Sequence, residues 1–259
     1  RAFGWKTAVY TLAITAISFW AVASSREALR AGLMPLFTTT AVYFFHRLTL
    51  PHRPLSKKQK QGLTIAFAVA VATTVHIYLS SRVAWLMYPA FLAYLALFHR
   101  ARFRAAWKAV AMGLLLAGLL VIPLFAYLQL HPEALTRLDM LDGPLNALKS
   151  GDLRPLLTNV SSALRGFVQP NAGDQFLAYN IPGRPVFVPL TALFFLIGTA
   201  VSIWRWRQPN YALLLLWFGA GIIPSLITGA TANTTRNMAA LTAVYTLPAL
   251  GFVYSSRWL

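Results

Sequence analysis

Long apolar runs of similar length, separated by polar stretches, are the feature that most constrains this chain. A helix that crosses the ~30 Å hydrocarbon core of a bilayer needs roughly 17–25 mainly apolar residues. Eight segments reach or approach that length: 7–23, 31–47, 63–79, 84–98, 108–128, 187–203, 211–227 and 239–254. The fourth segment is short and could pair with the third as a tight hairpin. We therefore expect an all-α integral membrane protein, with about eight transmembrane helices in a single domain over residues 1–259.

The composition excludes an ordinary soluble domain. Charged residues make up 11% of the 259 residues and hydrophobic residues 58%, whereas soluble domains carry about 25% charged residues. The chain has no cysteine, which excludes disulfides and thiolate chemistry. It begins with Arg1 rather than Met, so we expect a further part of the protein to precede it.

The net charge of +17 is unevenly distributed along the chain. With residue 1 in the cytoplasm, 14 of the 23 Lys and Arg residues lie in segments 1–6, 46–61, 99–108, 204–210 and 255–259, and all six acidic residues lie outside. This matches the positive-inside rule and suits anionic phospholipids. Nucleic acid is not needed to explain the charge. We expect a multi-pass plasma-membrane protein in which both termini of this chain are cytoplasmic.

One long polar segment, 130–186, is predicted to form an extracytoplasmic loop. Its residues 155–168 have apolar side chains at helical spacing, which predicts an amphipathic helix lying on the membrane. Asp174, Asn180 and Arg184 follow in a turn-rich stretch. They could line a cavity or bind an acceptor, and simple solvation in the loop is the alternative.

Four arginines fall in the predicted outer segments, close to span ends: Arg26, Arg30, Arg82 and Arg236. Arg26 and Arg30 are four residues apart, and they share one face if the segment is helical. Guanidinium groups bind phosphate oxygens through two parallel hydrogen bonds. These arginines could therefore converge on a lipid phosphate or pyrophosphate. The alternative is that they snorkel or bind ordinary phospholipid headgroups.

Four further residues could line the same cavity. Glu27 could pair with its neighbouring arginines, or act as an acid or base beside a phosphate. His76 and Tyr78 lie towards the end of a predicted span, and Asn237 follows Arg236. A histidine inside a membrane is either functional or bonded within the helix bundle. No glycine-rich phosphate loop, paired zinc histidines or serine nucleophile elbow occurs. We expect no metal site, and a need for a divalent cation stays open.

Several stretches together resemble a known family. The run SSREALRAGLMPLF (24–37) resembles a segment of bacterial membrane glycosyltransferases of the GT-C class, the protein-mannosyltransferase and aminoarabinose-transferase-like group. HIYLSSRVAWLMYP (76–89) is similar to the next outward hairpin of that group. NIPGRPVFVPLTALFFLIG (180–198) resembles its exit from the large outer loop, and TTRNMAAL (234–241) its late arginine-bearing loop.

The resemblance implies transfer of a sugar from a polyprenyl-phosphate donor to an acceptor on the outer face. It assigns the donor phosphate to Arg26 first, then to Arg30, Arg82 and Arg236. It places the catalytic acid in a first outer loop upstream of Arg1, and none of the six acidic residues here matches that position. The chain would then be the C-terminal part of such an enzyme, and whether it acts as an enzyme by itself stays open.

Two other functions remain possible from the sequence. A lipid-linked-saccharide transporter or flippase would need ionisable groups near the middle of the membrane, where His76 is the one plausible candidate. An O-antigen-ligase-like enzyme would also combine outer arginines with one large outer loop. It would use a pyrophosphate-linked glycan.

Overall fold

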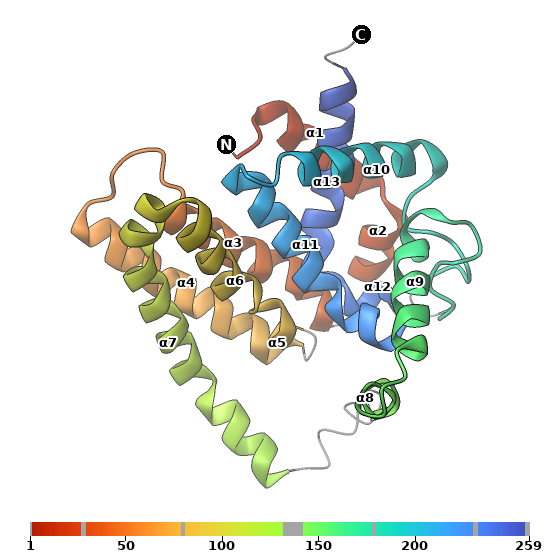
Figure 1. Ribbon diagram of the computed structural model, residues 1–259, viewed down its shortest axis with the longest axis horizontal. Helices are drawn as coiled ribbons and strands as arrows, with labels where there is room; N and C mark the ends of the chain where they lie inside the picture. The colour runs from red at the N-terminus through yellow and green to blue at the C-terminus, as the bar shows by residue number, and fades with distance from the viewer. Residues whose placement is uncertain are drawn as a thin grey trace. The chain divides into compact units, whose positions relative to one another are not determined.

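The computed structural model describes residues 2–26, 30–78, 81–131, 142–177, 180–229 and 233–256, and within these ranges the regular structure is entirely helical (Figure 1). The all-α prediction is therefore confirmed for the described part of the chain. The chain divides into two compact units. Unit 1 comprises Arg1–Gly32 and Arg137–Leu259, and unit 2 comprises Leu33–Thr136.

Several helices have the length and composition needed to cross a membrane. Four stretches qualify: α4 (Lys57–Ile77), α7 (Arg100–Leu130), α11 (Pro209–Thr228) and Met238–Ser255, which joins the 3₁₀ turn η3 (Met238–Ala240) to α13 (Leu241–Ser255). A fifth would be α1 (Trp5–Ile17) with α2 (Phe19–Arg26), which are bent by 58°. These helices indicate a multi-pass membrane protein.

The remaining predicted segments also contain helices, but shorter ones. They are α3 (Met34–Thr49), α6 (Met87–Phe98) after the short α5 (Ser81–Ala84), and α10 (Pro189–Trp204). A helix thus lies at each of the eight predicted positions, whereas, among the described residues, four or five stretches meet the length and hydropathy of a span. The number of eight spans stays a prediction.

Unit 2 is built around aromatic side chains. Helix α4 packs against both α3 and α7, and α6 packs against α7. At the centre, the ring of Phe45 lies 4.9 Å from that of Tyr88, and the ring of Phe67 lies 5.0 Å from the same tyrosine. All three side chains are fully buried. Close edge-to-face pairs of this kind add to the stabilisation from burial itself.

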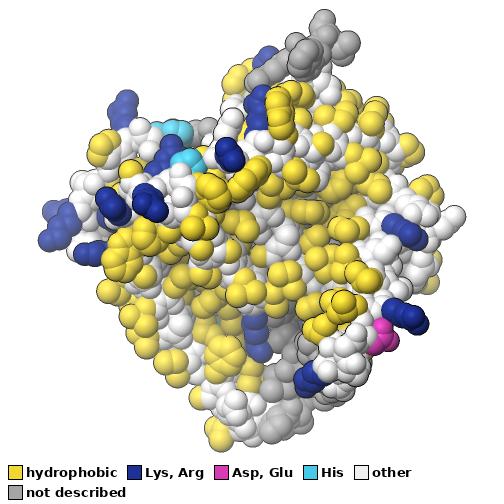
Figure 2. Space-filling model, viewed as in Figure 1, with side chains coloured by type: hydrophobic (Ala, Val, Ile, Leu, Met, Phe, Trp, Pro, Cys, Tyr) yellow, Lys and Arg dark blue, Asp and Glu magenta, His cyan; other side chains and the backbone are white. Residues whose placement is uncertain are grey.

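The basic loops of unit 2 meet at one of its ends. Helix α4 begins with a capping box, in which Ser56 Oγ accepts from Gln59 N at 3.2 Å and Gln59 Oε1 accepts from Ser56 N at 3.0 Å. One turn later, Lys60 Nζ donates to the carbonyl of Ala105 in α7. Segments 46–61 and 99–108 are therefore neighbours, and Figure 2 shows Lys and Arg side chains gathered over these turns. The positive-inside rule predicts that basic loops lie on one side of the membrane, and the proximity of these two loops agrees with it.

Unit 1 is centred on α13, which packs against α10 and α1. The contact with α10 depends on two buried glycines. A Cβ at Gly198 would lie 1.9 Å from the carbonyl oxygen of Leu247, and one at Gly251 would lie 2.0 Å from that of Phe194. Small residues allow this close approach of helix backbones in membrane proteins.

The bend between α1 and α2 is the main departure from the predicted span 7–23. Ser18 has an extended backbone (φ −76°, ψ 133°) and ends α1. Its hydroxyl forms a hydrogen bond with the Tyr245 hydroxyl of α13. Because the interrupted helix is bonded to a residue 227 positions away, the local apolar pattern could not predict the break.

Unit 1 has two distinct ends. At one end Asn210 Nδ2 donates to the carbonyl of Ala2 at 2.9 Å, and Gly4 and Ser256 line a common small hollow. At the other end α11 finishes at Thr228, after 20 residues, or ~30 Å of helix. The segments predicted to be cytoplasmic, 1–6, 204–210 and 255–259, thus gather at one end through their described residues.

The predicted long loop contains two helices, α8 (Asp142–Lys149) and α9 (Arg154–Val168). The predicted amphipathic helix over 155–168 is confirmed in its bounds. Its buried face, which includes Ala163 and Phe167, packs on α11. Leu157 and Leu164 remain exposed on it. Part of the apolar face is therefore occupied by protein, and its placement on the membrane stays a prediction.

Candidate functional site

The candidate site is at the end of unit 1 where α11 finishes. It is built from three segments that are distant in the sequence: α2, the described residues 171–177 and 180–186 of the long loop, and α12 (Asn233–Arg236). Asp174 is the residue that joins the last two. Its side chain is 1% exposed, and its Oδ2 accepts from Thr234 Oγ1 at 2.6 Å and from Thr234 N at 3.2 Å.

The loop is shaped so that this carboxylate reaches α12. Asp174 Oδ1 accepts from Phe176 N at 2.9 Å. Asn180 Nδ2 donates to the carbonyls of Asp174 at 3.1 Å and Arg184 at 2.8 Å. Gly173 is required where the two sides of the loop cross, because a Cβ there would lie 1.9 Å from the carbonyl oxygen of Arg184. These contacts join the two sides of the loop through its described residues.

Helix α2 is attached to the same group. Trp20 is buried, and its Nε1 donates to the carbonyl of Thr234 at 2.8 Å. The guanidinium of Arg184 lies 4.4 Å from the ring centre of Phe19, a geometry in which the cation is attracted by the ring face. We call Phe19, Trp20, Asp174, Asn180, Arg184 and Thr234 the Asp174 cluster.

The cluster fixes the helix that carries Arg236. Arg236 is half-buried, and its Nη1 donates to the hydroxyl of Thr228 at the end of α11. The next residue, Asn237, is buried and accepts from Ser225 Oγ at 2.7 Å. The guanidinium of Arg236 is thereby attached to the end of α11.

Arg26 and Arg30 belong to unit 1 as well. Arg26 is the last residue of α2, six positions after Trp20, and Arg30 begins the 3₁₀ turn η1 (Arg30–Leu33). Both side chains are exposed. Neither forms a hydrogen bond or an ion pair with other described residues of the chain. Glu27, which the sequence suggested as their partner, lies outside the described residues.

Three of the predicted site residues belong to unit 2. Arg82 in α5 lies 5.3 Å from the ring centre of Phe125, and its buried Nε has no hydrogen-bond partner within the described ranges. His76 is exposed near the end of α4, where its Nδ1 lies 2.9 Å from the carbonyl of Ala72. Tyr78 is half-buried at the C-cap of that helix. The expected convergence of Arg82 with Arg26 and Arg236 stays a prediction.

The described residues contain no group of three or more His, Cys, Asp or Glu side chains that could hold a metal ion. Comparisons with protein-family models, with curated proteins and with solved structures gave no match. The resemblance to GT-C glycosyltransferases therefore remains an expectation from short sequence motifs.

Phe19, Trp20 and Asn233 also belong to this region, although the sequence did not indicate them as site residues. Trp20 and Phe19 read as ordinary span residues, although Trp20 makes a bond across 214 positions. Asn233 is also buried, and its Oδ1 lacks a partner among the residues described. Its Nδ2 is close to α9, since it lies 2.9 Å from a Cβ built on Gly166. The polarity of Asn233 between two apolar spans was the one available signal.

Proposed function

We propose that the Arg26 end of unit 1 binds the phosphate of a polyprenyl-phosphate-linked sugar at the outer face of a bacterial plasma membrane. The protein would use that donor in transfer of the sugar to an acceptor, as a glycosyltransferase. Arg26 would contact the phosphate, with Arg30 and Arg236 as further ligands from the same unit. Arg82 would contribute if unit 2 brings it to the same phosphate.

The observation that carries this proposal is the attachment of α12 to α2. Trp20 Nε1 and Asp174 Oδ2 bond to Thr234 from two sides, so the helix bearing Arg236 is held against the helix that ends at Arg26. The helices that carry Arg26 and Arg236 are therefore supported together, which would limit the backbone rearrangement needed for both to reach one phosphate.

The separation between the two ends of unit 1 supports an outer-face position for Arg26 and Arg236. The described parts of segments 1–6, 204–210 and 255–259 meet at one end, and Arg26, Asp174 and Arg236 belong to the other. Basic residues at an outer surface run against the positive-inside bias. Binding of a phosphate would explain why arginines lie at that surface.

The test is sugar transfer from a radiolabelled polyprenyl-phosphate donor, measured in membranes with the protein as the cell makes it. Arg26→Ala should lower transfer by at least about tenfold, the value of one charged hydrogen bond. Arg26→Lys should recover part of it, since the charge remains without the bidentate fork. Arg154→Ala, which removes an exposed arginine of α9, should not change transfer. Unaltered transfer by Arg26→Ala, at equal protein levels, would exclude the assigned role.

A further inference from the structure

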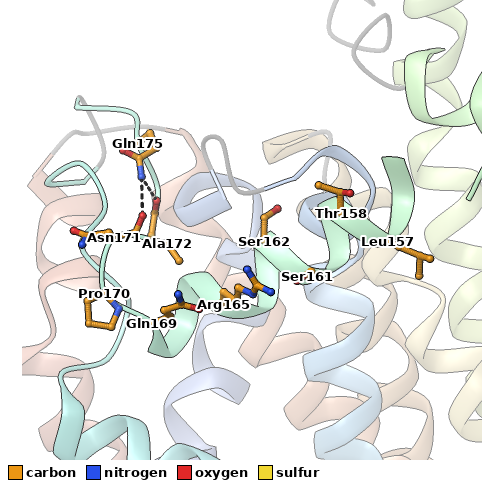
Figure 3. Close-up of a pocket in the computed structure, with 11 residues that line it drawn as sticks. Leu157, Thr158, Ser161, Ser162, Arg165, Gln169, Pro170, Asn171, Ala172 and Gln175 are labelled. Atoms are coloured by element: carbon orange, nitrogen blue, oxygen red, sulfur yellow. Dashed lines mark hydrogen bonds between the residues drawn. The ribbon is translucent and has the colours of Figure 1, made fainter. Parts of the chain in front are cut away.

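A hollow of unit 1 lies beside α9 and has a volume of about 730 Å³ (Figure 3). This is within the range of small-molecule binding pockets, about 300–1,000 Å³. One wall is a face of α9, from which Thr158, Ser161, Ser162 and Arg165 project. The other wall is the turn 169–175 that follows the helix.

The lining is rich in groups that both donate and accept hydrogen bonds. The lining residues include Thr158, Ser161 and Ser162, which carry hydroxyls, and Gln169, Asn171 and Gln175, which carry side-chain amides. The side-chain hydroxyl of Ser161 and the side-chain amide of Gln169 form no hydrogen bond with other described residues. Arg165 is the one charged lining residue. The absence of an acidic side chain from this lining argues against a cation as the ligand.

The turn that forms the second wall is held in place. Gln175 Nε2 donates to the carbonyls of Gly173 at 3.0 Å and Asn171 at 3.4 Å (Figure 3). Asn171 has φ 64°, the one positive value among the non-glycine residues described. Such a conformation persists only where the surrounding structure enforces it. Gly173 is followed directly by Asp174, so the turn is continuous with the Asp174 cluster.

We propose that this hollow binds a hydroxyl-rich saccharide. Sugar hydroxyls both donate and accept, as the Ser, Thr, Asn and Gln groups of the lining do. Arg165 would receive the carboxylate of an acidic sugar through charge-assisted bonds. The site stands apart from the proposed phosphate site, because none of Arg26, Arg30, Arg82 and Arg236 lines it.

The experiment uses the protein in phosphatidylcholine nanodiscs, applied to an array of neutral and uronate-containing oligosaccharides. Retention of a subset of these saccharides is expected. Ser161→Trp, which fills the hollow from a half-buried helix position, should weaken their binding at least tenfold. Ser150→Trp is the matched control, since Ser150 is exposed and does not line the hollow. It should leave binding unchanged.

Arg165→Ala separates the two kinds of sugar. It should weaken binding of uronate-containing saccharides more than binding of neutral ones. Retention of no saccharide above that of empty nanodiscs would overturn the proposal. Binding that persists equally in Ser161→Trp would also overturn it, because the saccharide would then occupy another part of the surface. Neither outcome depends on the polyprenyl phosphate.

Discussion

Asp174 is the residue on which the candidate site depends most. A buried carboxylate is costly unless it is fully hydrogen-bonded, and here it accepts from Thr234 N, Thr234 Oγ1 and Phe176 N. Bonds to a charged acceptor contribute about 1.5–3 kcal/mol each. The loop and α12 are therefore joined by a stronger link than neutral side chains would provide.

Removing that carboxylate should destabilise unit 1. We expect Asp174→Ala to lower the free energy of unfolding by about 3 kcal/mol or more, because three donors lose their acceptor inside the protein. Unfolding in mixed detergent micelles, followed by tryptophan fluorescence, measures this. Asp152→Ala is the matched control: Asp152 is exposed and accepts one described bond, from Arg154 N, so about 1 kcal/mol or less is expected. Equal losses for the two variants would contradict the role of Asp174.

The sequence predicted which residues of the loop belong to the site better than it predicted which residues they contact. Asp174, Asn180 and Arg184 were selected as cavity-lining candidates because they are polar residues in a turn-rich stretch. In the structure, Asn180 donates to the carbonyl of Arg184 within the loop, and Asp174 accepts from Thr234. The guanidinium of Arg184 lies over the ring of Phe19. Partners 60 or more positions away leave no periodic signal in the sequence, so Trp20 and Thr234 could not be assigned in advance.

At the scale of elements, α10 and α13 approach each other closely through two glycines. Gly198 and Gly251 face each other across this contact, and the amide nitrogen of each lies 2.9 Å from a Cβ built on the other. The apolar runs predicted both helices, because hydrophobicity over about 16 residues is a strong local signal. The same apolar runs do not indicate which glycines pack against the backbone of another helix. The break at Ser18 and the helix α8 were missed for a related reason, since neither follows from hydropathy.

Alanine at these glycines should separate α10 from α13. Gly198→Ala and Gly251→Ala should each lower the free energy of unfolding by about 1–3 kcal/mol, the usual cost of overpacking. Gly118→Ala and Gly219→Ala are matched controls, because nothing lies within 4 Å of a Cβ at either helical site. They should be neutral or stabilising, as alanine favours the helix. Unfolding in detergent distinguishes the pairs, and destabilisation of all four equally would refute the close contact.

At the scale of the whole molecule, the charge pattern and the helices both indicate a multi-pass membrane protein, but they differ in the number of spans. Four or five helical stretches meet the length and hydropathy of a span, whereas the sequence predicted eight. Unit 2 has its basic loops together, joined by Lys60 and Ala105, and unit 1 gathers the described parts of its predicted cytoplasmic segments. Within each unit, described parts of the predicted cytoplasmic segments therefore lie together. The sequence could predict this grouping because it depends on the distribution of charge, not on packing.

The central claim is that Arg26 and Arg236 bind a phosphate, and a paired lipid measurement tests it most directly. The chain in phosphatidylcholine nanodiscs is titrated with a polyprenyl phosphate and with the polyprenol that lacks only the phosphate. We expect saturable binding of the phosphate form, with affinity at least about tenfold lower in Arg26→Ala and in Arg236→Ala. Arg154→Ala should bind as the unmodified chain does. Equal binding of the polyprenol, or an undiminished affinity in both variants, would contradict the account.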